Sequence, residues 1–501
     1  MAPPLTPGRA GLAVALVTLV GGALALNHHL VGIFYDDGLY AGLGWALAHG
    51  RGYVYPNLPG TPVAVHYPPL YPLLLAPLFG LLSVPAAALA GKVLGVACAA
   101  LANGLIAWHA ARLQLLGAGT LSWPAAVVVA TAALAIPSLT VLTVLLSEPL
   151  FALLLVIGVI LADRPPDRLP ARRAALFAGA AAALSLLVRS IGVAAGVGIV
   201  WRVWRGARAE GREIAWRRAA VAALPLATAG LSWGLWVLTH QGGIDPLLAP
   251  DYGSYFDLLR AAGPGALGGT TADIGRPLGV LTLGWVPGRA LYYACGLPAL
   301  AVGLYGLWCV SLRSSIGPSL LVYLTILACW PVSPDRFLWA VLPWIALVWV
   351  SGAVGLWRYA ALRFPVAALC LALVWGYAGY ELRGFAGGLW DVAGRRISTD
   401  FAVVLPALDS LPRDAVIAAD NEPLVWLYTG RAAVPRDVYG PPPPVYRAYL
   451  ERQGVTHLLL APGRADGARD LERLSAAYPG WLTPIRRWPG GGALFAVRHE
   501  R

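Results

Sequence analysis

Long apolar segments recur along most of this chain, and they restrict what it can fold into more than any other feature. A helix of about 20 apolar residues spans the hydrocarbon core of a bilayer. Only 12% of the 501 residues are charged, against about 25% in a soluble domain. The sequence therefore predicts a mainly α, polytopic membrane protein of about eleven spans, at residues 11–31, 86–110, 122–141, 147–162, 174–188, 191–204, 219–238, 289–311, 317–331, 337–356 and 365–383.

Arg189 separates two half-length apolar segments, which a single long helix would also accommodate. A charge in the middle of a bilayer is costly, so we expect Arg189 at a re-entrant tip or in a wet cavity. Segment 68–82 is apolar but short and rich in proline. Proline breaks helices, so we predict an interfacial or partly inserted element there.

The charges of the loops orient the chain. With the N-terminus in the cytoplasm, the inner loops collect arginines and the outer loops collect acidic residues, as the positive-inside rule requires. This pattern also accounts for the net charge of +12 without a nucleic-acid partner. The inner group is Arg112, Arg164, Arg168, Arg172, Arg173, Arg202, Arg205, Arg208, Arg212, Arg217, Arg218, Arg313, Arg358 and Arg363, and the outer group is Asp36, Asp37, Glu148, Asp245, Asp251, Asp257, Asp273 and Asp335.

An odd number of spans places the C-terminus outside the cytoplasmic membrane, and the composition becomes that of a soluble domain from about residue 395. Residues 415–420 and 456–463 are predicted strands, and 443–454 is a predicted helix that ends at Gly454. Alternating strands and helices indicate a small α/β domain. We therefore predict a membrane domain over 1–394, with its first outer loop at 32–85, and an extracytoplasmic α/β domain over 395–501.

An acidic pair, Asp36 and Asp37, directly follows the first apolar segment and precedes a stretch with helical periodicity at 38–49. Aspartate is favoured before a helix in any case, because it caps the N-terminus. A carboxylate at the outer lipid–water boundary is also well placed to deprotonate an acceptor hydroxyl. The second carboxylate would then orient the first or hold a cation.

The order of these features resembles the GT-C superfamily of integral-membrane glycosyltransferases. It is most similar to the bacterial branch with protein O-mannosyltransferases and aminoarabinose transferases. The resemblance rests on the acidic pair, the amphipathic helix and HYPPLYPLLLAPLFG at 66–80. Three short motifs also fit, namely LLSEPLF at 145–151, LLVRSIG at 186–192 and PDRFLWAVLPW at 334–344.

The resemblance implies a sugar donor linked to a polyprenyl phosphate and an inverting transfer to a protein, lipid or glycan acceptor outside the membrane. It implies Asp36 as the catalytic carboxylate, with Asp37 as its neighbour. Many relatives have Asp-Glu where this chain has Asp-Asp, which leaves the role of Asp37 open. Some relatives use a divalent cation and others do not, so no cofactor is assigned and a cation remains an option.

Two arginines are candidates for binding the donor phosphate, because the planar guanidinium binds phosphate oxygens in a bidentate way. They are Arg336 and Arg189. Arg336 would otherwise anchor its helix at the interface or pair with Asp335. Arg189 would otherwise pair with Glu148.

His66 and Tyr67 close the first outer loop and are further candidates for contact with the donor phosphate or the sugar. The alternative for His66 is an ordinary loop residue with satisfied hydrogen bonds. Tyr71 and Glu148 are candidates for the pocket, although Glu148 also suits the N-terminus of a helix. The tyrosines and aspartates at 251–257 would shape the acceptor side or form a solvated loop face.

A transporter or lipid flippase is the alternative function. Such a protein would carry charges within its spans and broken helices in matched positions of two repeats. The sequence offers one candidate break, at Arg189, and no matching partner. The glycosyltransferase is therefore the favoured hypothesis.

Overall fold

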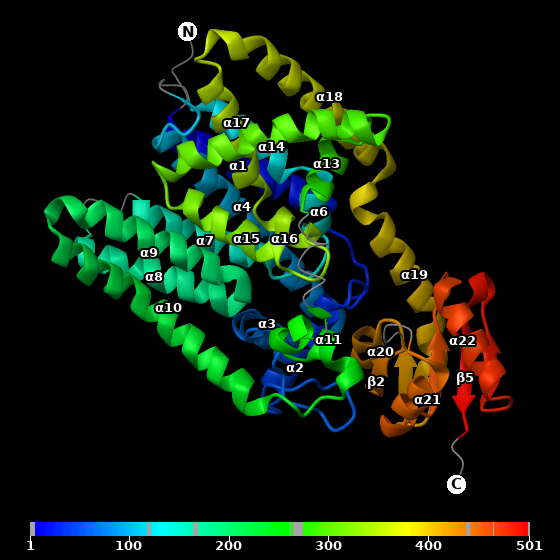
Figure 1. Ribbon diagram of the computed structural model, residues 1–501. Helices are drawn as coiled ribbons and strands as arrows, with labels where there is room; N and C mark the ends of the chain where they lie inside the picture. The colour runs from blue at the N-terminus through cyan, green and yellow to red at the C-terminus, as the bar shows by residue number, and fades with distance from the viewer. Residues whose placement is uncertain are drawn as a thin grey trace.

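Apolar helices pack into one bundle, and a small β-sheet lies at one end of it (Figure 1). The computed structural model describes residues 6–117, 122–163, 169–260, 262–263, 274–436, 441–463 and 465–498. Arg164, Arg168 and Asp273, used above to orient the chain, lie outside the described residues.

Six helical segments in the described ranges are long and apolar enough to cross a membrane, and a bent pair of shorter helices adds a seventh. The bent pair is α5 (Trp123–Ala133) and α6 (Ile136–Leu142), which meet at 62°. The six are α1 (Pro7–Ala25), α4 (Val84–Arg112), α8 (Ala171–Val188), α10 (Arg212–His240), α14 (Arg289–Ser311) and the stretch 360–409, which comprises α18 (Arg363–Gly387) and α19 (Leu389–Asp409).

Shorter helices occupy the remaining predicted spans. Each of the eleven predicted segments coincides with one helix or with a pair of helices, so the fold class is confirmed. The number that crosses a membrane remains a prediction, because several helices are short. These are α7 (Glu148–Asp163), α9 (Val193–Ala207), α15 (Ile316–Ala328), α16 (Asp335–Ala340) and α17 (Leu342–Leu356).

The bundle buries small residues between its helices and exposes large apolar ones. Gly11 of α1 packs on α4, where an added Cβ would lie 2.8 Å from the carbonyl oxygen of Gly104. Such close backbone contact is typical of helices in membranes. On the outside, the side chains of Leu231 and Phe364 are 74% and 84% exposed. A surface of this kind suits lipid rather than water, so the protein is a multi-pass membrane protein.

The chain breaks between α8 and α9, as the charge at Arg189 predicted. Helix α8 ends at Val188, Arg189 is extended with φ −147° and ψ 128°, and a 3₁₀ turn over Ser190–Gly192 leads into α9. The two helices then pack against each other. A single long helix is therefore excluded, and the Arg189 side chain projects from the break.

The first long loop contains two helices, α2 (Asp36–Ala48) and α3 (Leu70–Leu81), which pack on each other. Helix α3 continues through Pro77, so the short apolar segment is helical. Its 12 residues are fewer than a membrane span needs, and the partial insertion of this element remains a prediction. A helix that the sequence did not predict, α13 (Gly275–Leu283), lies farther along the chain, after the four-residue α11 (Ala249–Tyr252).

The C-terminal part forms a five-stranded mixed sheet in the order β2-β1-β3-β5-β4. Three strands are parallel, namely β1 (Val416–Ala419), β2 (Ala432–Pro435) and β3 (His457–Leu460), and β4 (Leu482–Arg487) and β5 (Ala493–Val497) add an antiparallel edge. The helices here are α20 (Glu422–Thr429), α21 (Pro443–Arg452) and α22 (Ala465–Ala477). The predicted α/β character and both predicted strands are confirmed.

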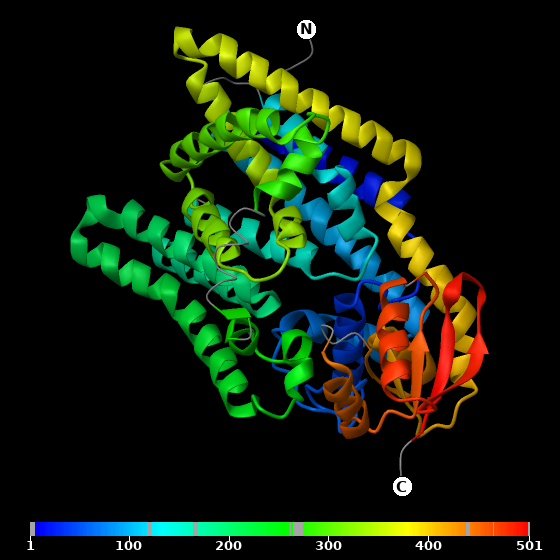
Figure 2. The ribbon, with the colours of Figure 1, turned by 45° about the vertical axis from the view of Figure 1, so that its right-hand side comes forward.

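Helices α18 and α19 form a long arm that runs beside the bundle and joins it to the sheet (Figure 2). The predicted division at residues 394/395 falls inside α19, and the division itself remains a prediction. The loop that contains α2 lies against α20. The first long loop and the C-terminal part of the chain therefore meet at this end of the molecule.

Candidate active site

A cavity of about 330 Å³ lies where the first loop, the break at Arg189 and helix α16 come together. This is within the usual range for small-molecule sites. Aromatic rings and four charged groups form its wall. The lining residues are Tyr35, Asp36, Tyr40, His66, Tyr67, Pro68, Val188, Arg189, Ser190, Ile191, Val193, Pro250, Asp251, Tyr255, Leu258, Ile326, Trp330, Val332, Ser333, Arg336 and Phe337.

Asp36 is the first residue of α2, and its carboxylate faces this cavity. The Tyr67 hydroxyl donates to Oδ1 at 2.9 Å, and Arg336 Nη1 donates to Oδ2 at 2.9 Å. Burial raises the pKa of Asp36, but the charge of Arg336 and the Tyr67 hydrogen bond outweigh it, so the pKa lies below its usual value. Asp36 is therefore ionised at neutral pH and can accept a proton.

Arg336 and Arg189 converge on a single oxygen of Glu148. Arg336 donates to Glu148 Oε1 through Nε at 3.1 Å and Nη2 at 3.0 Å, and Arg189 Nη1 lies 2.8 Å from the same atom. Arg189 also lies over the Phe337 ring, 4.5 Å from its centroid. Arg336 thus bridges Asp36 and Glu148. Its alternative partner, Asp335, accepts a hydrogen bond from the Ser333 hydroxyl. Both arginines face the cavity, and Glu148 lies behind them.

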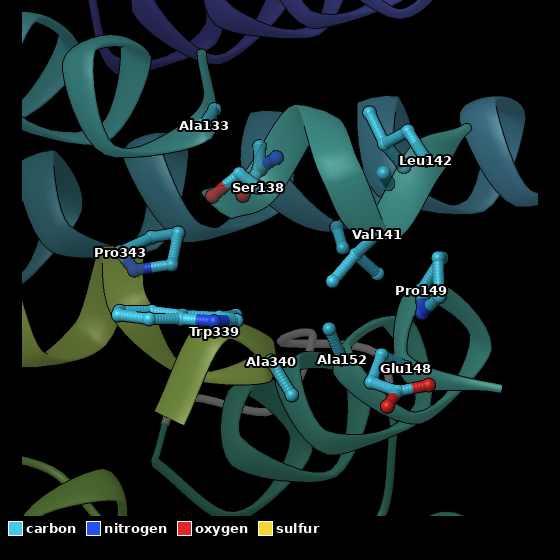
Figure 3. A pocket seen from close by; sticks show the side chains of 13 residues that line it. Ala133, Ser138, Val141, Leu142, Glu148, Pro149, Ala152, Trp339, Ala340 and Pro343 are labelled. Atoms are coloured by element: carbon cyan, nitrogen blue, oxygen red, sulfur yellow. The ribbon is translucent and has the colours of Figure 1, made fainter. Parts of the chain in front are cut away.

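A second, smaller cavity of about 40 Å³ lies on the other side of Glu148, between α4, α6, α7 and the start of α17. Figure 3 shows the Glu148 carboxyl group at one edge of this cavity, near Pro149 and Ala152. Glu148 Oε2 is buried, and no group in the described part of the chain forms a hydrogen bond with it. Glu148 therefore lines this small cavity and reaches the larger one only through the two arginines.

Asp37 faces away from the cavity. Its carboxylate accepts from the backbone N–H of Gly32 at 2.7 Å and from that of Phe34 at 2.9 Å. Burial raises its pKa to about 6 despite these two hydrogen bonds. The acidic pair therefore divides into Asp36, which lines the cavity, and Asp37, which binds the preceding turn.

The two remaining candidates from the first loop, His66 and Tyr67, both line the cavity. The ring of His66 donates through Nδ1 to the carbonyl of Gly253 at 2.8 Å. Burial lowers the pKa of His66, so the ring is neutral at pH 7. Tyr71 is not among the lining residues. It is buried behind Tyr40, with ring centroids 5.0 Å apart.

Residues 251–257 were expected to form a solvated face or to shape the acceptor side. A solvated face is wrong for Tyr252, which is fully buried and hydrogen-bonded to Asn57 and Glu422. Tyr255 and Asp251 line the cavity. Sequence reasoning did not single out Trp330 or Phe337, because aromatic residues are common at the ends of membrane spans. Their rings line the cavity, with centroids 6.0 Å apart.

A divalent cation remains an option from the sequence resemblance. Among the described residues there is no group of three or more His, Cys, Asp or Glu side chains close enough to hold a metal ion. We assign no metal ligand.

No protein-family model and no curated protein matches the sequence. Solved structures do match the fold. ArnT from Cupriavidus metallidurans in the apo state is 15% identical, with 97% of both chains covered and a TM-score of 0.53. The Archaeoglobus fulgidus oligosaccharyltransferase in complex with Zn and sulfate is 14% identical, with 97% of this chain and 73% of that chain covered and a TM-score of 0.53.

A further match is the archaeal oligosaccharyltransferase AglB from Archaeoglobus fulgidus, in complex with an inhibitory peptide and a dolichol-phosphate. It is 11% identical, with 97% of this chain and 74% of that chain covered and a TM-score of 0.51. At such low identity the similarity establishes the fold. The protein therefore has the same overall fold as ArnT and the archaeal oligosaccharyltransferase.

Proposed function

We propose that the protein is a glycosyltransferase that moves a sugar from a polyprenyl-phosphate donor to an acceptor hydroxyl, with inversion. The cavity would open outside the cytoplasmic membrane, with the N-terminus in the cytoplasm and residues 395–501 outside. One observation carries the proposal. A carboxylate, Asp36, and two arginines, Arg336 and Arg189, line one cavity in a protein with this fold.

Asp36 is the base. A carboxylate has about four lone-pair positions, and Tyr67 and Arg336 use two of them. The remaining positions are available to the acceptor hydroxyl. Asp36 accepts the hydroxyl proton while the acceptor oxygen forms a bond to the anomeric carbon of the sugar. The acceptor is a protein, a lipid or a glycan.

The leaving group is the polyprenyl phosphate. The bond between the anomeric carbon and the phosphate oxygen breaks, and its electron pair stays on that oxygen, on the face opposite to the attack. Phosphate leaves readily, so it needs charge stabilisation more than protonation. Arg336 and Arg189 would supply that charge, and Glu148 fixes both guanidinium groups from behind.

The matching structures support the donor class. The archaeal oligosaccharyltransferase with a TM-score of 0.51 was solved with a dolichol-phosphate, which is a polyprenyl phosphate. The aromatic wall of the cavity, including Tyr255 and Trp330, suits the apolar faces of a sugar ring.

The test is donor turnover. The purified, detergent-solubilised protein is incubated with a panel of polyprenyl-phosphate sugars and a delipidated envelope extract as the source of acceptors. Mass spectrometry follows conversion of each donor to free polyprenyl phosphate. We expect the wild type to consume one donor, and Asp36→Asn, which retains the shape but removes the base, to consume none.

Asp470→Asn serves as the matched control, because Asp470 lies on α22, away from the cavity, with only a loose 3.8 Å ion pair to Arg473. It should have wild-type turnover. Equal turnover by wild type and Asp36→Asn would refute Asp36 as the base. Binding of donors without turnover, combined with their movement across proteoliposome membranes, would favour the flippase.

A further inference from the structure

The segment just before Asp36 belongs structurally to the C-terminal part of the chain. Ile33 is buried in an apolar cluster that otherwise comes from α19, α20 and the sheet, including Phe401, Val404, Leu424 and Val425. The backbone N–H of Leu30 donates to Ser398 Oγ at 3.1 Å, and that of Val31 donates to the Tyr428 hydroxyl at 3.1 Å. The domain core therefore includes part of the first loop.

Asn421, which directly precedes α20, binds the loop three and four residues before Asp36. Its buried side-chain amide donates from Nδ2 to the carbonyl of Gly32 at 2.8 Å and to that of Ile33 at 3.2 Å. Gly32 has φ +95°, and a Cβ on it would lie 2.7 Å from the Cβ of Leu424. The loop backbone is thus pressed directly against α20, where only glycine fits.

Tyr35 connects this bound segment to Asp36 through a strained turn. Its φ is +68° and its ψ is −72°, and the backbone N–H of Asp36 donates to the carbonyl of Phe34 at 2.9 Å. These angles and this bond define the rare form of the γ-turn. A strained conformation of this kind persists only where the surroundings impose it.

The surroundings of this turn are Asp37 on one side and Asn421 on the other. Asp37 binds the N–H groups of Gly32 and Phe34, and Asn421 binds the carbonyls of Gly32 and Ile33. The polar groups of the segment are therefore fixed from both sides. The direction in which α2 begins, and hence the position of the Asp36 carboxylate, follows from the conformation of the turn.

We propose that Asn421 is a positioning residue for Asp36, and that the C-terminal domain serves to impose the turn that places this carboxylate in the cavity. The proposal rests on the function proposed above, in which Asp36 is the base. Asn421 itself is not among the residues that line the cavity. Its effect on transfer is exerted through the backbone of residues 32–35.

The test compares Asn421→Ala with Thr429→Ala. Thr429 lies at the other end of α20 and its hydroxyl donates to Val425, so its removal perturbs the same helix without contacting the loop. Turnover gives kcat and the KM for the donor. Hydrogen exchange of the backbone amides at residues 31–36 reports whether the turn is formed, independently of enzyme activity.

We expect Asn421→Ala to lower kcat by about 10- to 100-fold, as misplacement of a catalytic group does, while the donor KM stays within about twofold. Exchange of the amides of Gly32, Phe34 and Asp36 should become faster, while that of β1 and β3 is unchanged. Thr429→Ala should retain the wild-type kcat and the wild-type exchange at 31–36. Wild-type kcat in Asn421→Ala, or wild-type exchange at 31–36, overturns the proposal.

Tyr428→Phe keeps the proposal testable if Asn421→Ala fails to fold. It removes only the hydroxyl that binds Val31, so we expect a smaller fall in kcat and faster exchange at 31–36. Unchanged values in Tyr428→Phe overturn the proposal. The two proposals can fail separately. Full turnover by Asp36→Asn refutes the role of Asp36 as the base. Full turnover by Asn421→Ala, in an enzyme that needs Asp36, refutes the role of Asn421 in positioning it.

Discussion

Helix α7 begins and ends with a carboxylate whose side chain is buried and contacted by basic residues, and the two ends differ in what lies beyond them. At its start, Arg336 and Arg189 both contact Glu148 Oε1, and both arginines line a cavity. No group in the described ranges forms a hydrogen bond with Glu148 Oε2. At its end, Asp163 has both oxygens occupied and is fully buried.

The Asp163 cluster joins four parts of the bundle. His109 of α4 lies 3.0 Å from Oδ2, and the Ser314 hydroxyl donates to the same oxygen. The backbone N–H of Ser315 donates to Oδ1 at 2.7 Å, and Arg202 of α9 lies 3.4 Å from Oδ1. The two buried carboxylates of α7 therefore differ in whether their basic partners face a cavity. A saturated cluster stabilises the packing, and a cluster with cations facing a cavity has groups left to bind a ligand.

The largest expected effect of this difference concerns Asp36, which belongs to the cavity end. Asp36→Asn should lower kcat by about 10²- to 10⁴-fold, which is the usual contribution of a general base. Its melting temperature should stay near that of the wild type, because the shape and the Tyr67 contact are retained. Donor turnover and a thermal melt in detergent measure the two quantities. A fall in melting temperature that accounts for the lost activity would contradict the catalytic role.

Asp163→Ala should show the opposite pattern. Removing one partner of a buried ion cluster typically costs about 3–5 kcal/mol of stability, because His109 and Arg202 are left unpaired. Activity per folded molecule should persist. Glu213→Gln is the control, because it breaks an exposed pair with Arg217 that contributes little. A normal melting temperature for Asp163→Ala would show that this cluster is not structural.

Arg336→Lys sharpens the comparison within the cavity end. Lysine retains the charge but loses the planar fork that contacts Asp36 and Glu148 together, so we expect turnover to fall by about 10-fold or more. Arg313 donates to the carbonyl of Gln114 and does not line the cavity, so Arg313→Lys should retain wild-type turnover. Equal turnover by the two variants would indicate that charge alone suffices at Arg336.

Glu422 is a third kind of buried carboxylate, whose partner is a tyrosine hydroxyl rather than a cation. It accepts from the Tyr252 hydroxyl at 2.6 Å, and burial raises its pKa to about 8, with Tyr35 and Asp251 as the other titratable groups nearby. The folded state therefore retains this proton up to about pH 8, whereas the unfolded chain releases it near pH 4.5.

Since the folded state binds more protons in that window, stability should fall as the pH rises from about 4.5 to 8, by up to about 1.4 kcal/mol per pH unit. Asp37, with its pKa raised to about 6, acts in the same direction at lower pH. Thermal melts of Glu422→Gln should have a shallower dependence on pH. Glu451→Gln, at an exposed pair with Arg447, should follow the wild type. If the melting temperatures of wild type and Glu422→Gln depended on pH in the same way, Glu422 would be excluded as the source of the pH dependence.

Much of the layout could be predicted from the sequence, because hydropathy and charge act locally. The apolar segments became helices, and the cost of burying Arg189 correctly predicted the break between α8 and α9. The acidic pair and both arginines were also identified from the sequence. What sequence reasoning missed depends on distant contacts. The opposite directions of Asp36 and Asp37 follow from a turn that is bound by Asn421, 389 residues away from Gly32.

The burial of Ile33 in the C-terminal core also sets an order of events during synthesis. At about 5–20 residues per second, the ribosome needs roughly 20–80 s to travel from this loop to Asn421. During that time Asp36 is already inserted at the membrane, but the turn before it has no domain to impose its shape. A nascent or truncated chain would therefore carry an unfinished site. Synthesis and folding of the last residues would be the step that makes the protein competent.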